Sequence, residues 1–212
     1  MPGTAIVIGA TGLIGQQLVE LLLNSGYDAV KTISRRPLPL EHPKLEQTVA
    51  SLEEGPELEK ALKGDALFCC IGTTIKKAGS QAAFTAVDHD IPVRCGRIAR
   101  RNGVSQYHLV SAIGAKAGSR NFYLRTKGNV EAALTAMDFP SLYIYRPSFL
   151  VGERKEVRFG EQLAAWLMPV FNLVLQGNAK KYRPVKGATV AETMLRKSGE
   201  GEKGVHIIYF NL

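Results

Sequence analysis

The sequence contains few cysteines, and their arrangement excludes both a disulfide framework and a cysteine-based metal site. Cys69, Cys70 and Cys95 are odd in number and include an adjacent pair. A chain of 212 residues can bury a core large enough to fold without disulfides or a structural metal. We therefore expect inert core thiols, no metal, and a cytoplasmic location, because the cytosol keeps thiols reduced.

Long apolar runs are also absent. The longest, residues 163–175, is broken by Pro169 and Asn172 and is shorter than the ~20 residues of a membrane helix. A glycine-rich turn interrupts the first apolar run after residue 8. We expect neither integral membrane association nor a signal peptide.

Acidic residues are fewer than basic ones, 19 against 27, which gives a net charge of +8. The basic residues come in short clusters such as Arg35-Arg36 and Lys76-Lys77, without blocks of five or six like charges or interleaved aromatic residues. This pattern argues against nucleic acid as a partner and leaves a membrane surface or small anionic molecules.

Apolar segments with the spacing of strands and helices alternate along the chain. Strands are predicted at residues 5–8, 29–34, 45–49, 66–71, 107–111 and 142–146, and helices at 16–24, 56–62, 80–102 and 121–137. Pro92 predicts a kink or interruption in the third helix. The alternation predicts an α/β fold, a Rossmann-type doubly wound parallel sheet with right-handed crossovers.

The tail from about residue 152 to 212 is too short for an independent domain, so residues 1–212 are expected to form one domain. Helices are predicted at 159–175 and 189–197, and a strand at 205–210. We expect the tail to supply the last strand and a small cap on the substrate side of the sheet. An apolar helix face with Trp166 at its centre could pack in the core, line a substrate pocket or form a homodimer contact.

The turn Gly9-Ala10-Thr11-Gly12-Leu13-Ile14-Gly15 stands between the first predicted strand and helix. Gly9 and Gly12 would allow a tight turn and close approach of a pyrophosphate, and Gly15 would let the helix pack on the strand. The N–H groups at the helix start would bind the phosphates. The alternative is a purely structural turn.

The second strand ends in Ser34-Arg35-Arg36, where an NAD site usually has an acidic residue. Guanidinium groups bind a 2′-phosphate through charge-assisted hydrogen bonds. We expect NADP(H) to be preferred over NAD(H), with Arg35 as the main contact; otherwise the arginines are solvated surface charges.

Tyr123 and Lys127 are four residues apart in a predicted helix and therefore share one face. A nearby ammonium lowers the pKa of a phenol, so Tyr123 could exchange a proton with a substrate oxygen. Ser111, at the end of the fifth predicted strand, could polarise a substrate carbonyl.

Gly9 to Gly15, Ser111, Tyr123 and Lys127 together resemble the motifs of short-chain dehydrogenases/reductases. More narrowly, the sequence resembles the atypical branch that contains the Tat-interacting-protein-like oxidoreductases and their bacterial relatives. This resemblance covers residues 4–195, and its motifs are Cys69-Cys70-Ile71-Gly72-Thr73-Thr74, Phe122-Tyr123, Lys127-Gly128-Asn129-Val130-Glu131 and Arg146-Pro147-Ser148.

The resemblance implies an NADP(H)-dependent oxidoreductase that acts on a small carbonyl or alcohol through a Ser-Tyr-Lys proton relay. It implies that Lys127 also binds the nicotinamide ribose, and it assigns further residues to the cofactor: Gly72, Thr73, Thr74, Arg146, Pro147 and Ser148. The sequence departs from the classical pattern after the fourth strand, where Ile71-Gly72-Thr73-Thr74 replaces Asn-Asn-Ala-Gly, and it has no acidic residue at 49–51. The alternatives are a non-enzymatic NADP(H) sensor or partner-binding protein, and a nucleotide-sugar isomerase, which the short tail disfavours.

One further group, Asp88-His89-Asp90, suggests metal or base chemistry at first sight. Consecutive helical residues point about 100° apart, so the three cannot converge on one site. We expect them to be solvated or to pack against neighbouring helices.

Overall fold

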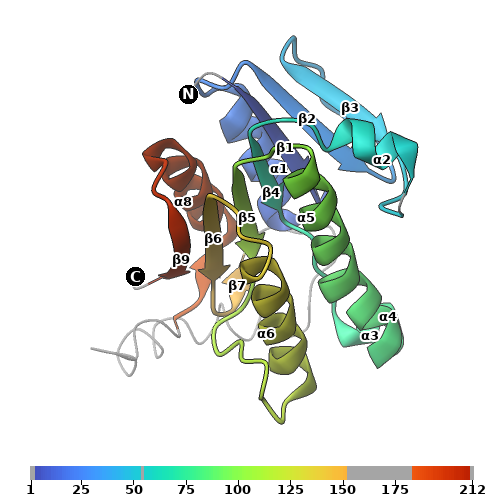
Figure 1. Ribbon diagram of the computed structural model, residues 1–212, viewed down its shortest axis with the longest axis vertical. Helices are drawn as coiled ribbons and strands as arrows, with labels where there is room; N and C mark the ends of the chain where they lie inside the picture. The colour runs from blue at the N-terminus through green and yellow to red at the C-terminus, as the bar shows by residue number, and fades with distance from the viewer. Residues whose placement is uncertain (1–2, 54, 152–182, 211–212) are drawn as a thin grey trace.

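The computed structural model describes residues 3–53, 55–151 and 183–210 (Figure 1). Within these ranges, seven parallel strands form one sheet in the order β3-β2-β1-β4-β5-β6-β9. The strands are β1 (Thr4–Ile8), β2 (Ala29–Ser34), β3 (Leu45–Val49), β4 (Ala66–Cys69), β5 (Gln106–Val110), β6 (Ser141–Arg146) and β9 (Gly204–Tyr209). The order reverses between β1 and β4, so the predicted doubly wound Rossmann-type sheet is confirmed.

Helices cover both faces of the sheet, which explains why its central strands are apolar throughout. Every residue of β4 is buried, as are the last four of β1. One face packs against α1 (Leu13–Leu23) and α8 (Gly187–Glu200), and the other against α2 (Pro56–Ala61), α5 (Ile91–Arg101) and α6 (Phe122–Thr135).

The long helix predicted at 80–102 is interrupted at the place that proline indicates. It consists of α4 (Gln81–Thr85), a π-helical turn (Ala86–Asp90) and α5. Pro92 has no N–H to donate, and its ring would clash with the carbonyl four residues earlier, at Asp88. The wider turn relieves that conflict, and it places the Asp88 side chain in the interior, 1% exposed.

Two short elements were not predicted from the sequence. The segment after β4 contains a four-residue helix, α3 (Ile75–Ala78), and the Thr74 hydroxyl caps it by accepting a hydrogen bond from the Lys77 N–H. A two-stranded parallel sheet joins β7 (Leu150–Val151) to β8 (Val185–Lys186). Segments of two to four residues are too short to show a period.

The described part of the tail belongs to the main layers of the domain. Helix α8 packs against α1, and β9 pairs with β6 as the seventh strand. The helix predicted at 159–175, with the cap and dimer roles of Trp166, lies outside the described residues. Among the residues that the structure describes, no helix has the length and apolar character to cross a membrane.

Four rings stack across neighbouring strands on the α1/α8 side of the sheet. Phe68, His108, Tyr143 and His206 occupy paired register positions, with ring centroids 4.4, 4.7 and 4.9 Å apart in turn. The His108 Nδ1 atom lies 2.9 Å from the Tyr145 hydroxyl. Burial lowers the pKa of His108 to about 3, so its ring is neutral in the folded protein.

This buried imidazole predicts a loss of stability in mild acid. The unfolded chain binds a proton at His108 below pH ~6.5 and the folded chain does not, so the free energy of unfolding falls by up to about 1.4 kcal/mol per pH unit as pH drops below 6.5. The loss continues toward the folded pKa of about 3. Urea unfolding of His108→Phe at pH 7, 6 and 5 should show a shallower dependence than the parent. The control His206→Phe, at the half-buried end of the stack, should keep the parental slope, and equal slopes in all three proteins would contradict the assignment.

Candidate active site

The glycine turn after β1 has the shape of a dinucleotide cradle. Gly9 has a φ of 80°, and a Cβ there would lie 2.6 Å from the Cys70 carbonyl carbon. A Cβ on Gly15 would lie 2.2 Å from the Gly9 carbonyl oxygen, so helix and strand pack at a distance that only glycine permits. Gly12 is the N-cap of α1 and offers no side chain to cap it. The backbone N–H groups at this helix start are thus placed to receive phosphate oxygens, and the residues fit a bound dinucleotide.

The other predicted residues of this turn contribute through the backbone. Leu13 and Ile14 are buried, with side chains in the core, whereas Thr11 is exposed. Only the N–H groups of the two apolar residues can face a ligand.

The end of β2 places two cations at the same edge of the sheet. Arg35 and Arg36 are exposed, so both guanidinium groups are available to a ligand. The Ser34 hydroxyl is buried and donates to the Arg36 carbonyl at 2.6 Å, so it closes the turn.

The segment after β4 is fixed by a buried carboxylate. The Thr73 N–H donates to Asp88 Oδ2 at 2.8 Å, and Thr74 caps α3. Gly72 lies beside the same carboxylate, with its Cβ position 3.5 Å from Asp88 Oδ1. The predicted cofactor segment therefore adjoins Asp88.

Asp88 also holds Lys127. The Lys127 Nζ lies 2.8 Å from Asp88 Oδ1, and the two side chains are 6% and 1% exposed. Burial by itself lowers the pKa of Lys127, but the charge of Asp88 and their hydrogen bond raise it by more, so the net shift is upward. Lys127 is thus a charged ammonium fixed in the interior.

Tyr123 lies one helical turn before Lys127 on α6. Its ring is half-buried and packs against Phe84, with centroids 5.8 Å apart. Its hydroxyl makes no hydrogen bond within the described ranges, 3–53, 55–151 and 183–210. The Tyr123 charge contributes to the raised pKa of Lys127, as expected for side chains on one helix face.

Ser111 points to a different partner from the one that a Ser-Tyr-Lys relay requires. Its hydroxyl donates to Glu131 Oε1 at 2.5 Å. Glu131 in turn accepts from Arg146, at 3.0 Å from Nε and 2.5 Å from Nη2, and Arg146 Nη1 donates to the Tyr209 hydroxyl at 2.7 Å. The Ser111 proton is committed to a carboxylate, so polarising a carbonyl requires the hydroxyl to rotate away from Glu131.

The turn after β6 is tied to its neighbours on both sides. The Pro147 carbonyl accepts from the Ile113 N–H at 2.9 Å, and the Ser148 hydroxyl donates to the Arg183 carbonyl. Arg146 is engaged by Glu131, so it is not a free cation for a cofactor. All three residues predicted here, Arg146, Pro147 and Ser148, therefore have hydrogen-bond partners within the protein.

Sequence reasoning missed the two buried carboxylates. Of the two roles expected for Asp88, the solvated one is wrong and packing against a neighbouring helix is correct, but that packing includes an ion pair with Lys127 of α6 that was not foreseen. Among the described residues, His89 and Asp90 pair with each other at 2.8 Å. Two signals were available: Pro92 stands four residues after Asp88, and Glu131 stands four residues after Lys127 on the same helix face.

Comparison with known proteins gives one family and several full-length relatives. Residues 9–162 match a family described as NAD(P)H-binding. The chain is 30% identical to the mitochondrial protein FMP52 of Debaryomyces hansenii over 202 residues, which covers 93% of this chain and 88% of that one. It is 35% identical to the protein HTATIP2 of Rattus norvegicus over 166 residues, covering 76% and 68% of the two chains. These relatives agree with the resemblance to the atypical short-chain reductase branch.

Solved structures show the same fold at low identity. MoeE5 in complex with UDP-glucose and NAD superimposes with a TM-score of 0.75 at 19% identity, covering 97% of this chain and 75% of that one. The UDP-glucose 4-epimerase of Thermotoga maritima gives a TM-score of 0.74 at 16% identity, covering 99% and 77%.

The relatives overturn one expectation from composition. The prediction of a cytoplasmic location is wrong, because FMP52 of D. hansenii and FMP52-1 of Scheffersomyces stipitis are named mitochondrial proteins. Free thiols indicate only a compartment that does not oxidise them, so cysteine usage could not separate the two. The thiols themselves are as expected: Cys69 and Cys95 are buried, Cys70 is half-buried, and burial raises the pKa of each.

The buried ion pair predicts a stability effect that an exposed pair would not give. Asp88→Ala leaves the Lys127 ammonium buried without a counter-charge, which should lower the free energy of unfolding by about 3–5 kcal/mol. The matched control Asp90→Ala removes a half-exposed partner of His89 and should cost less than about 1 kcal/mol. Denaturant titration measures both, and similar losses in the two variants would refute the burial argument.

Proposed function

The chain belongs to the NAD(P)H-binding family, and from that premise we propose that it is an NADP(H)-dependent oxidoreductase that interconverts a small carbonyl compound and its alcohol. The observation that carries the proposal is the Tyr123 hydroxyl, which makes no hydrogen bond to any residue that the structure describes and lies one turn from the ammonium of Lys127, which Asp88 fixes in place. Such a phenol, beside a buried cation, is suited to exchange a proton with a bound substrate.

The chemistry divides between the cofactor and the chain. When bound, NADPH supplies the hydride for the carbonyl carbon. Tyr123 donates its proton to the carbonyl oxygen, and the positive charge of Lys127 stabilises the tyrosinate that remains. In the oxidation direction the same tyrosinate accepts the proton of the alcohol. Ser111 Oγ can accept a hydrogen bond from the Tyr123 hydroxyl or from the alcohol of the substrate while its own O–H donates to Glu131.

The cofactor would lie along the carboxyl edge of the sheet, across the switch point between β1 and β4. The N–H groups at the start of α1 would hold the pyrophosphate, and Gly72, Thr73 and Thr74 would line its path. Arg35 and Arg36 support NADP(H), since they offer two exposed cations at the end of β2. Pro147 and Ser148 would lie near the nicotinamide.

Two other functions compete with this one. A non-enzymatic NADP(H) sensor would need the cradle but not the Tyr123–Lys127–Asp88 group, and that group favours an enzyme. A nucleotide-sugar epimerase is suggested by the neighbours in the fold comparison, but the identity of 15–19% supports the fold alone. Turnover of a carbonyl substrate would distinguish the oxidoreductase from the non-enzymatic sensor.

Tyr123→Phe tests the catalytic assignment directly. Removing a positioned proton donor typically costs 10²–10⁴-fold in rate. NADPH oxidation with an accepted aldehyde or ketone should fall by that factor, while the dissociation constant of NADPH changes less than about twofold. Phe122→Leu, the adjacent substitution on α6, serves as the control for local packing. Full activity in Tyr123→Phe would exclude the assignment, and no turnover in a broad carbonyl screen would favour the sensor.

Arg35→Ala tests the choice of cofactor. A hydrogen bond to a charged group contributes roughly 1.5–3 kcal/mol, which corresponds to about a 10- to 100-fold preference for NADPH over NADH. The variant should lose most of that preference by binding NADPH more weakly, and added salt should weaken the preference in the parent. Calorimetric titration with both nucleotides measures this, with the exposed Arg97→Ala as control. Equal affinities in the parent would show that the arginines are solvated.

A further inference from the structure

Two stretches of the chain that meet at the ring of Tyr123 carry basic residues and no acidic ones. Residues 70–87 follow β4, and residues 111–130 follow β5 and continue into α6. Neither stretch contains an Asp or a Glu. Their six basic residues are Lys76, Lys77, Lys116, Arg120, Arg125 and Lys127. In a chain with 19 acidic residues, this concentration at one site requires an explanation.

The two stretches meet at the catalytic end of the molecule. Parallel strands end at the same edge of the sheet, so the segments after β4 and β5 lie together. Phe84, in helix α4 within the first stretch, packs against Phe122 and Tyr123 with ring centroids 5.7 and 5.8 Å away. Both basic segments therefore adjoin the start of α6.

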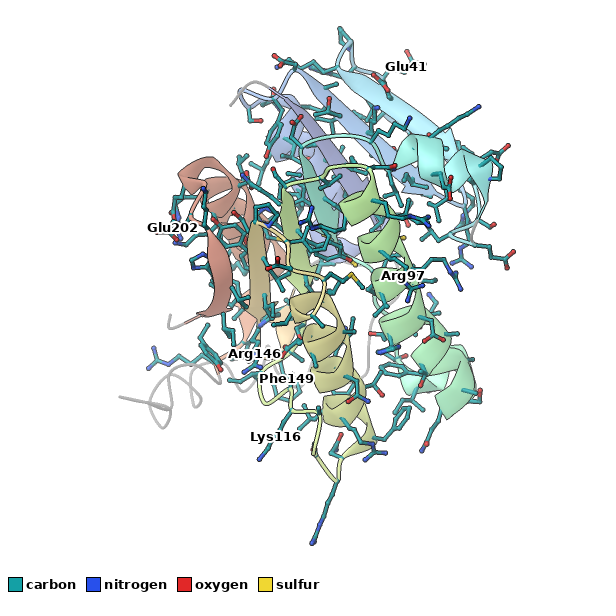
Figure 2. The ribbon with its side chains drawn as sticks, viewed as in Figure 1. Glu41, Arg97, Lys116, Arg146, Phe149 and Glu202 are labelled. Carbon is teal, nitrogen blue, oxygen red and sulfur yellow. The ribbon has the colours of Figure 1, made fainter. Side chains whose placement is uncertain are left out.

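The nearest carboxylates do not offset these cations at the surface. Asp88 is buried and paired with Lys127, and Glu131 is buried and paired with Arg146. Four acidic residues stand before strands, at the opposite edge: Asp28, Asp65, Asp138 and Glu202. In Figure 2, Glu202 lies in the upper half and Lys116 near the lower end, below Arg146.

The loop that carries Lys116 and Arg120 is held firmly against α6. The Lys116 N–H donates to the Leu124 carbonyl at 3.1 Å. Arg125 Nη1 donates to the Ser119 and Arg120 carbonyls at 2.9 and 3.1 Å. A Cβ on Gly128 would lie 2.2 Å from the Ala117 nitrogen, so the loop touches the helix beside Lys127. The loop backbone is fixed, and the Lys116 and Arg120 side chains extend from it into solvent.

We propose that the substrate carries an anionic group, a carboxylate or a phosphate, which Lys116 and Arg120 receive beside Tyr123. This inference rests on the proposed oxidoreductase function and names the class of its substrate. It is separate from cofactor choice, because Arg35 and Arg36 follow β2 on the other side of β1. Clustered charges of one sign beside a site raise the local concentration of an oppositely charged ligand by 10-fold or more.

A pair of probes that differ in one charge tests the proposal. The anionic probe is 4-carboxybenzaldehyde and the neutral one is its methyl ester, each assayed for kcat/KM at saturating NADPH. The parent should prefer the anion at low ionic strength, and salt should reduce that preference. Lys116→Glu/Arg120→Glu should lower the ratio of the two kcat/KM values by about tenfold or more. The control Lys60→Glu/Lys203→Glu makes the same change in net charge at exposed positions outside the two stretches, and it should change the ratio less than about twofold.

A binding measurement keeps the proposal testable if neither aldehyde is reduced. In that case calorimetry with NADP⁺ present compares 4-(hydroxymethyl)benzoate with 4-(hydroxymethyl)benzamide, and the oxidoreductase function is judged separately by the broad carbonyl screen. Tighter binding of the benzoate that is lost in Lys116→Glu/Arg120→Glu supports the anion site by itself. Equal binding of the two, or an unchanged kcat/KM ratio in the double variant, overturns the proposal. A third outcome also overturns the proposal: the parent binds phosphatidylserine vesicles, the double variant does not, and the parent distinguishes neither pair of probes. The cations would then bind a membrane surface.

Discussion

The arrangement of the site depends on one buried carboxylate with two partners. Asp88 is 1% exposed and binds Lys127 from α6 and the Thr73 N–H from the segment after β4. An ammonium as deeply buried as Lys127 is stable only with a counter-charge at contact distance. The π-helical turn that Pro92 imposes brings Asp88 to that position. A helix irregularity, the proposed cofactor segment and the proposed catalytic lysine are thus connected through one side chain.

A second buried carboxylate, Glu131, likewise connects residues from different elements, in this case Arg146 and Ser111. Glu131 stands one turn after Lys127 and binds Arg146 through both oxygens while accepting a hydrogen bond from the Ser111 hydroxyl. Helix α6 therefore presents Tyr123, Lys127 and Glu131 along one line, and each of the two charged groups is neutralised by a residue from another element. Because both ion pairs are internal, the loops around the site determine the charge that an approaching ligand meets.

The sequence was sufficient where local chemistry decides the structure. The sequence pattern located all seven strands of the main sheet to within two residues at their ends, most clearly for the central strands β1, β4, β5 and β6, which are almost fully buried. The glycine turn and the Tyr123–Lys127 spacing are local patterns as well. Asp88 and Glu131 could not be assigned in this way, since each acts through a partner 15 to 39 positions away that only the fold brings close.

The comparison with sugar-nucleotide enzymes shows what the fold leaves undetermined. Chains that share less than one residue in five with this one have the same sheet, with TM-scores of 0.70 to 0.75. Sheet order and the cradle position the dinucleotide, and they are common to many chemistries. The segments after β4 and β5 carry the candidate site of this chain: a carboxylate fixes Lys127, and residues 70–87 and 111–130 contain no acidic side chain. Because those segments adjoin Tyr123, we expect them, rather than the sheet, to select the substrate. Their basic residues would do so by electrostatic attraction of an anionic ligand.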